Sequence, residues 1–332
     1  MEPVHKRKRI DSPTNRENPG PPGISRSTLW FDDGNIILQA ESIIFRVHRS
    51  VLALHSPVLR DMFLLARPDM DIEPDFGCPL VRMEGDLGSE WEELLTLIYH
   101  GFSKTRPGDT LSFIQISAML RLGHKYSFRS YRAEALERFL DAFGPDWDTI
   151  MVTDDGTIDT ERMHMDDSHS WSDVVNLAYD LRLNQALPLI YFNAIAHTSY
   201  PAYLFEGTKS NNGRISYVHE DIRRHLICTQ NNLYAALRRH TFSWMFTPIG
   251  DSDCDCWDFL LGLISQTYTP RLDVAKALGV WDEVECQGLC SECRTAAQAS
   301  FEHGRDNLWD ALPSVFGLPS WDVLEASLEE LD

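Results

Sequence analysis

Cysteine is the residue type in this chain whose spacing could support metal chemistry. Five of the seven cysteines lie within one stretch near the end of the sequence: Cys254, Cys256, Cys286, Cys290 and Cys293. A Cys-x-Cys pair comes first and a Cys-x-x-Cys pair ends the stretch. Four thiolates can hold a structural zinc ion in a tetrahedral site. Such a site would join the loop around Asp251 to a helix that starts near Arg294.

The alternative interpretation is that these cysteines are thiols without a metal. Cys-x-Cys is an unusual zinc knuckle, and residues 287–289 do not read as a typical zinc ribbon. An odd number of cysteines spread over a long chain indicates a reducing compartment and not a disulfide framework. We therefore predict no obligatory cofactor. A structural zinc ion held by Cys254, Cys256, Cys290 and Cys293 is the alternative that the sequence leaves open.

The remaining chemistry-bearing residues do not predict an enzyme. His164 and His169 flank Asp166 and Asp167 in a polar stretch, which we interpret as a surface loop without a hydrophobic pocket. The sequence has no Gly-x-x-x-x-Gly-Lys-Ser/Thr phosphate loop, no Gly-x-Gly-x-x-Gly and no Gly-x-Ser-x-Gly. No nucleophile with a supporting base can therefore be named, and we predict a non-enzymatic protein.

Composition and charge narrow the class of protein. The chain has 332 residues, of which 43% are hydrophobic, so one large or two ordinary globular domains are expected. A formal net charge of -20 repels phosphate backbones, so nucleic-acid binding is not expected. No secretory signal and no apolar run long enough for a bilayer are visible. We expect a protein of the cytoplasm or nucleus.

The first 27 residues are expected to form a disordered tail. Proline and glycine are dense there, and they interrupt regular structure. Within this tail Lys6, Arg7, Lys8 and Arg9 form a basic run. Such a run is a candidate nuclear-localisation signal, and a solvated charge run is the alternative.

The pattern from residue 28 to residue 141 predicts an α+β domain. Alternating, β-branched runs predict a hairpin and a later strand, and apolar residues at helical spacing predict five helices. The expected strands are 35–40, 43–48 and 79–83, and the expected helices are 49–55, 57–65, 89–101, 110–126 and 130–140. This order indicates a small sheet packed against helices.

The rest of the chain is expected to be a linker followed by a mainly helical domain. Residues 142–170 are acidic and polar, and we interpret them as a linker or long loop. Residues 171–332 are expected to contain helices at 171–181, 188–195, 223–237, 257–264 and 294–312. The tryptophans of this half are expected in helix packing: Trp171, Trp244, Trp257, Trp281, Trp309 and Trp321.

The stretch from Asp33 to Phe63 resembles the core of the BTB/POZ family. From Phe45 onward it carries the ordered pattern Phe-x-Val-His-x-x-Val-Leu-Ala-x-x-Ser-Pro-Val-x-x-x-Met-Phe. A later segment that ends Tyr-x-Gly at Gly101 resembles the family's next helix. The resemblance implies a protein–protein interaction module at 28–141 that forms homodimers or associates with other proteins. The closing run 305–321 resembles the tail of a large fungal, basidiomycete-like group of BTB-domain proteins.

Two family features bear on the expected partners. Many BTB dimers carry an aspartate at the start of the first strand and a basic residue after the motif histidine, which line a charged pocket. Here the matching positions are Asn35 and Arg49. We expect the motif histidine, His48, to be a buried hydrogen-bonding residue.

A second use of the family is to adapt substrates to cullin ubiquitin ligases. Such members often carry a hydrophobic-x-Glu element in the loop after the second helix. Between residues 67 and 75 the only glutamate is Glu73, and Asp71 stands at the hydrophobic position. A self-associating scaffold is therefore the first prediction, and a cullin adaptor or a nuclear transcription-related scaffold is the alternative.

Overall fold

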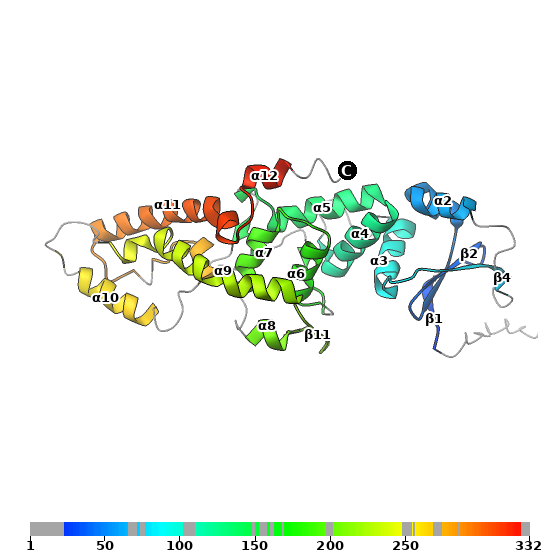
Figure 1. Ribbon diagram of the computed structural model, residues 1–332, viewed down its shortest axis with the longest axis horizontal. Helices are drawn as coiled ribbons and strands as arrows, with labels where there is room; N and C mark the ends of the chain where they lie inside the picture. The colour runs from blue at the N-terminus through cyan, green and yellow to red at the C-terminus, as the bar shows by residue number, and fades with distance from the viewer. Residues whose placement is uncertain are drawn as a thin grey trace, which may run out of the picture.

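The computed structural model describes residues 23–65, 72–73, 77–101, 110–147, 150–152, 158–159, 163–167, 169–196, 202–247, 254, 256–267, 274–283 and 286–326. The molecule is elongated, with a small sheet at one end and the helices α10 and α11 at the other (Figure 1). We refer to residues 25–143 as the sheet region and to residues 163–326 as the helical region. In the described part of the chain, no helix combines the length and apolar character that a membrane span requires.

The sheet has five strands in the order β1-β3-β2-β5-β4. They are β1 (Ser25–Trp30), β2 (Ile36–Ala40), β3 (Ile43–Val47), β4 (Ile72–Glu73) and β5 (Cys78–Arg82). The predicted hairpin is confirmed, because β2 and β3 pair antiparallel with Leu38 opposite Phe45. Strand β1 was not predicted. It begins inside the segment 1–27 and pairs parallel with β3, so regular structure starts earlier than the proline and glycine content indicated.

All five predicted helices of the sheet region are present. They are α1 (Arg49–His55), α2 (Pro57–Leu65), α3 (Gly88–His100), α4 (Phe113–Tyr126) and α5 (Arg129–Phe143). Ser112 and Gln115 form a capping box at the start of α4. Ser56 is fully buried, and its Oγ accepts the Leu59 N–H at 3.0 Å at the start of α2. These local signals explain why the helix starts were readable from the sequence.

Part of the segment 142–170 docks onto the sheet region, which corrects our interpretation of Asp166 and His169 as a surface loop, whereas His164 and Asp167 are exposed as that interpretation expected. The segment contains β7 (Met151–Val152), β8 (Ile158–Asp159) and β9 (Met163–His164), and β9 pairs parallel with β6 (Leu111–Ser112). Met163 is buried in the core. Asp166 accepts the Ile114 N–H at 3.0 Å and lies 2.7 Å from the His169 ring, which packs edge-on against Phe113. Asp166 thus satisfies an otherwise unpaired N–H in the first turn of α4.

The predicted mainly helical character of the second half is confirmed. Its helices are α6 (Trp171–Asp180), α7 (Leu187–Ala196), α8 (Ala202–Glu206), α9 (Glu220–Arg239), α10 (Cys256–Thr267), α11 (Ser291–Val315) and α12 (Trp321–Ala326). The 3-10 turns η3 (Ser243–Met245) and η4 (Ala275–Leu278) and the short pair β10 (Thr208–Lys209) and β11 (Ile215–Ser216) lie between them. A capping box of Ser170 and Asp173 starts α6.

Most tryptophans of this half pack between helices, as expected. Trp309 stacks on Trp321 with 4.9 Å between ring centroids, and Trp244 meets Trp281 edge-on at 5.1 Å. Trp257 is the exception, because 41% of it is exposed on α10. The expectation for Trp257 was wrong: α10 lies at the end of the molecule, where few elements are available to cover it (Figure 1).

The sheet region and the helical region share one hydrophobic core, which extends from Leu29 to Phe316. Arg121 on α4 crosses the junction, with its guanidinium 3.2 Å from Asp180 on α6 and 3.5 Å from Glu90 on α3. Further along, Gly304 lets α11 approach the end of α9 closely. A Cβ at this position would clash with the His240 carbonyl oxygen. The shared core and the Arg121 contacts therefore pack the sheet region against the helical region. The Gly304 contact packs α9 and α11 together within the helical region.

Candidate functional site

The two residues predicted to line a charged pocket lie together at the start of α1. The Asn35 Oδ1 accepts the Arg49 N–H at 2.8 Å. The Arg49 guanidinium donates to the Phe63 carbonyl at 2.6 Å and lies over the Phe63 ring. Asn35 therefore caps the first turn of α1, and Arg49 ties α1 to the end of α2. Both side chains have a defined structural role, and their predicted contact with a partner stays a prediction.

His48 is a hydrogen-bonding residue at the junction of β3 and α1, as expected, but it is only partly buried, with 22% of its side chain exposed. Its backbone N–H donates to the Tyr99 hydroxyl at 2.8 Å, and its Nδ1 lies 3.3 Å from the same oxygen. The other ring nitrogen lies 3.2 Å from an Asp33 carboxylate oxygen. Burial raises the pKa of Tyr99, so this hydroxyl stays protonated and can bond to its neighbours. The arrangement joins α3 to the hairpin.

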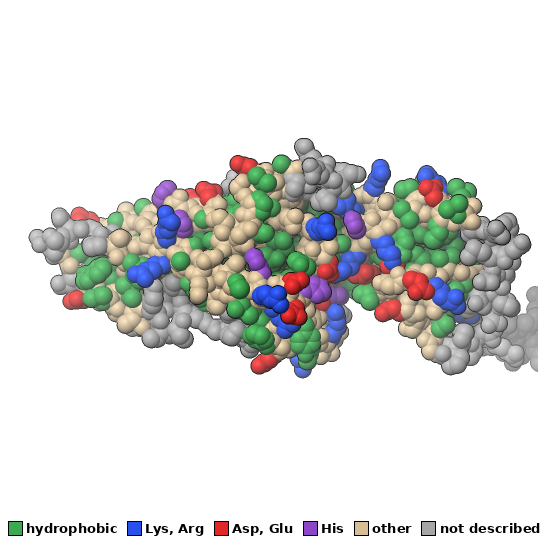
Figure 2. Space-filling view, viewed as in Figure 1, with side chains coloured by type: hydrophobic (Ala, Val, Ile, Leu, Met, Phe, Trp, Pro, Cys, Tyr) green, Lys and Arg blue, Asp and Glu red, His purple; other side chains and the backbone are tan. Residues whose placement is uncertain are grey.

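Helices α1 and α2 carry a set of exposed apolar side chains, which we call the α1–α2 face. Its members are Leu54, Val58, Leu64 and Leu65, with exposed fractions between 41% and 84%. Val58 and Leu65 are seven residues apart, a spacing that places them on the same side of α2. Hydrophobic side chains gather at the end of the molecule that carries α2 (Figure 2). Exposed apolar residues grouped in this way are typical of surfaces that bind other proteins.

A second exposed apolar set lies on the helical region. It consists of Phe205 on α8, Ile215 on β11 and Tyr217 just after β11, each more than half exposed. Hydrophobic side chains are also visible along this edge of the molecule in the region of α8 and β11 (Figure 2). We call this set the α8–β11 face.

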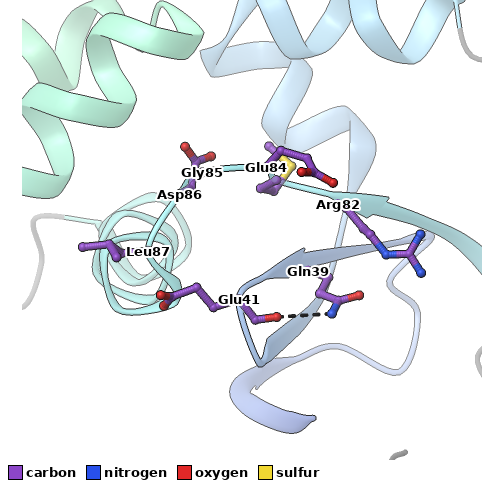
Figure 3. A pocket seen from close by; sticks show the side chains of 8 residues that line it. Gln39, Glu41, Arg82, Glu84, Gly85, Asp86 and Leu87 are labelled. Atoms are coloured by element: carbon purple, nitrogen blue, oxygen red, sulfur yellow. Dashed lines mark hydrogen bonds between the residues drawn. The ribbon is translucent and has the colours of Figure 1, made fainter. Parts of the chain in front are cut away.

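A polar pocket of about 360 Å³ opens where the β2–β3 hairpin meets the start of α3. Figure 3 shows Glu41 reaching from the hairpin toward the turn of chain before α3. The Glu41 carboxylate accepts the Gly88 N–H at 3.0 Å, and the Glu41 carbonyl accepts from Gln39 at 3.2 Å. A carboxylate at the start of a helix is stabilised by the helix dipole. Glu41 therefore holds the hairpin to α3.

Asp86, on the same pocket wall, is the most connected carboxylate of the sheet region among the described contacts. It accepts from Trp91 Nε1 at 3.0 Å, from the Tyr126 hydroxyl at 2.6 Å and from Lys125 Nζ at 2.5 Å. Burial and the bond to Asp86 raise the pKa of Tyr126. The Asp86 side chain is 5% exposed, so these donors replace the water that a buried carboxylate loses. The pocket is therefore a structural junction.

A larger cavity, of about 730 Å³, lies in the helical region between α6, α7 and α9. Tyr179, Tyr191 and His225 contribute to its lining. Burial raises the pKa of Tyr191 to about 12 and lowers the pKa of His225, so both groups are uncharged at neutral pH. Asp180, also on the wall, already contacts Arg121 and His219.

The four cysteines singled out from the sequence meet at the far end of the helical region. The sulfur atoms of Cys254, Cys256, Cys290 and Cys293 all lie within 4.8 Å of one another. The Cys254 and Cys293 sulfurs are 3.5 Å apart. The fifth cysteine, Cys286, is buried and lies outside this group, in agreement with the four residues named from the sequence. None of the seven cysteines forms a disulfide.

Backbone N–H groups point at these sulfurs. The Cys290 N–H donates to the Cys256 sulfur at 3.1 Å, and the Cys293 N–H donates to the Cys290 sulfur at 3.5 Å. Hydrogen bonds from Cys293 lower the pKa of Cys290 to about 7, whereas burial raises the pKa of Cys293. Donors of this kind stabilise thiolate sulfur.

Two sets of predicted residues fall on parts of the chain that the structure does not describe. The basic run Lys6, Arg7, Lys8 and Arg9 lies outside the described residues, and so do residues 67–75 apart from Ile72 and Glu73.

Comparison with known proteins identifies one segment of the chain. Residues 32–141 match the BTB/POZ domain family. The match covers the hairpin, the motif around His48 and helices α1 to α4 with most of α5. Domains of this family are in general non-enzymatic protein–protein interaction modules. No curated protein matches the chain.

Proposed function

We propose that this protein, whose residues 32–141 are a BTB/POZ domain, is a scaffold that associates with a second copy of itself and binds other proteins. The observation that carries the proposal is the exposed α1–α2 face on a domain whose family mediates protein association. Covering one leucine side chain contributes about 1.5–3 kcal/mol, so burial of this face would favour pairing.

Self-association through the α1–α2 face would be symmetric. A two-fold dimer uses the same surface on both copies, so each apolar side chain is buried twice in one interface. Leu54 and Leu65 are the most exposed members of the face, at 79% and 84%. They are therefore the residues whose replacement by a charged side chain should disrupt pairing most directly.

The test is the mass of the full-length protein in solution. Size-exclusion chromatography with light scattering at tens of micromolar should give twice the chain mass of 38.0 kDa. The double variant Leu54→Arg/Leu65→Arg should elute as a monomer. The control is Phe205→Arg, which places a single arginine on the α8–β11 face and should stay dimeric. A monomeric wild-type protein at this concentration would contradict the proposal.

Binding of other proteins is assigned to the α8–β11 face. Its three members are apolar and exposed, and they lie on the helical region, away from the proposed dimer surface. Affinity purification from the native host should recover a set of partners with the wild-type protein and with the Leu54→Arg/Leu65→Arg variant. The Phe205→Arg variant should lose those partners while it stays dimeric.

The alternatives named from the sequence stay predictions. A role as a cullin adaptor depends on residues 67–75, most of which lie outside the described residues, and a pull-down with a cullin N-terminal domain would distinguish it. A nuclear transcription-related role depends on Lys6 to Arg9 in the same way. A location in the cytoplasm or nucleus, the fungal grouping and the absence of enzymatic activity are likewise predictions.

A further inference from the structure

We propose that Cys254, Cys256, Cys290 and Cys293 hold one structural zinc ion that joins the start of α10 to the start of α11. The site would be a closed centre of four thiolates, with two ligands from each segment. It is independent of the proposed dimer surface, which lies at the other end of the molecule (Figure 1).

The first support is the spacing of the sulfur atoms. Zinc–sulfur bonds of about 2.3 Å in a tetrahedron place the four sulfurs about 3.8 Å apart. Here all four lie within 4.8 Å of one another, and the Cys254 and Cys293 sulfurs are separated by 3.5 Å. The four thiols therefore already surround one centre of the size that a zinc ion needs.

The second support is the hydrogen bonding of the sulfurs. The N–H groups of Cys290 and Cys293 donate to the sulfurs of Cys256 and Cys290. Groups that donate to a ligand atom orient it and stabilise its charged form, which is the form that binds metal. The turn before α11 therefore places N–H donors against the sulfurs of Cys256 and Cys290, in addition to packing against α10.

The third support is the fit of this turn against α10. Gly288 lies beneath the Phe259 ring, and a Cβ at position 288 would overlap the ring carbons. Only a residue without a side chain allows this approach. The approach brings the Cys-x-x-Cys pair onto the beginning of α10, where the Cys-x-Cys pair lies.

A metal ion would supply stability around α10, where the hydrophobic core covers few residues. Of the α10 residues whose exposure is described, Cys256 and Leu260 alone are buried, and Trp257 and Leu261 are exposed. Structural zinc contributes directly to folding free energy. On binding, each coordinating thiol gives up its proton to solvent as a sulfur–zinc bond forms, so up to four protons leave for one zinc ion taken up.

Metal analysis of the full-length protein, purified under reducing conditions without added metal, tests the proposal. About one zinc ion per chain is expected. Less than about a tenth of an ion per chain, or iron in place of zinc, would overturn it. The variant Cys254→Ser/Cys293→Ser should lose the zinc. The matched control Cys228→Ser/Cys286→Ser removes two other cysteines and should retain it.

If the Cys254→Ser/Cys293→Ser variant unfolds around α10, hydrogen exchange of the wild-type protein provides a second test of the zinc site. Zinc is removed from the wild-type protein with a chelator, and exchange is compared before and after. Protection should fall in α10 and the first turns of α11, while the sheet region and the oligomeric mass stay unchanged. Full retention of zinc by Cys254→Ser/Cys293→Ser, or equal loss of protection throughout the chain, would place the metal elsewhere and reject the site.

Discussion

Helices α4 and α10 lie in the sheet region and at the far end of the helical region, and they are held by different means. α4 begins with a capping box and buries nine of its residues, among them Phe113, Ile116 and Met119. α10 has a comparable length but buries only Cys256 and Leu260 among the residues whose exposure is described. One helix is stabilised by a complete hydrophobic environment. The other contacts the core largely through partly buried side chains, among them Phe259, Leu263 and Ile264.

This difference teaches that the two ends of the molecule should respond differently to the same kind of perturbation. A change within the sheet region disturbs a core that many residues share, so its effect should reach the whole cooperative unit. A change at the cysteine cluster should stay local. The experiments below test this contrast, beginning with the largest expected effect.

Replacement of Asp86 by alanine should be the most destabilising of the changes considered. The variant leaves three donors, on Trp91, Tyr126 and Lys125, without their carboxylate partner in a buried site. Loss of one partner from such a group costs about 3 kcal/mol or more. Urea unfolding followed by circular dichroism would measure it.

The control for this change is Asp61→Ala. Asp61 is 63% exposed and pairs with Arg60 on the surface of α2, so its removal should cost less than about 0.5 kcal/mol. Equal losses for the two variants would show that the Asp86 hydrogen bonds do not stabilise the sheet region.

Replacement of Gly304 by alanine tests whether α11 is closely packed away from the cysteines. The new methyl group would clash with the His240 carbonyl oxygen, so α9 and α11 must separate. Alanine in a helix normally stabilises by about 1 kcal/mol relative to glycine. The clash should reverse this sign and cost about 2 kcal/mol.

Gly262→Ala in α10 is the matched variant, because nothing lies within 4 Å of a Cβ there. It should be neutral or stabilising in the same urea experiment. A destabilising Gly262→Ala would contradict the open environment of α10 and remove the contrast between the two helices.

Alkaline pH should weaken the helical region through Tyr191. Burial raises its pKa to about 12 in the folded protein, above the value of about 10 expected in the unfolded chain. The contribution of the neutral Tyr191 hydroxyl to stability is therefore complete below pH 10 and is lost as the pH rises through 12. The loss from this group should be about 1.4 kcal/mol at pH 11.

The measurement is the free energy of unfolding at pH 9 and pH 11 for the wild-type protein and for Tyr191→Phe. The phenylalanine variant should show a smaller fall. Tyr217→Phe, at a position that is 55% exposed, should behave like the wild type. An identical fall in the wild type and in Tyr191→Phe would show that this hydroxyl does not titrate with folding.

The sequence by itself determined the elements whose signals are local. The run from Phe45 to Phe63 specified a strand and two helices in order, and Ser112 and Ser170 marked helix starts through side chains that bond to the backbone nearby. The residue types at Cys254 and Cys290 also indicated soft-metal chemistry before any geometry was known. Such signals are readable because the interacting groups are a few residues apart.

The tertiary structure alone decided the features that depend on distant partners. Strand β1 forms because β3 offers an edge, and Asp166 docks because the first turn of α4 has an unpaired N–H. The close approach of Gly288 to Phe259 of α10 likewise depends on the assembled chain. Trp257 is exposed for a related reason, since no spacing rule states how many neighbours a helix at the end of a molecule will have. Burial and long-range pairing are properties of the assembled chain and not of its local pattern.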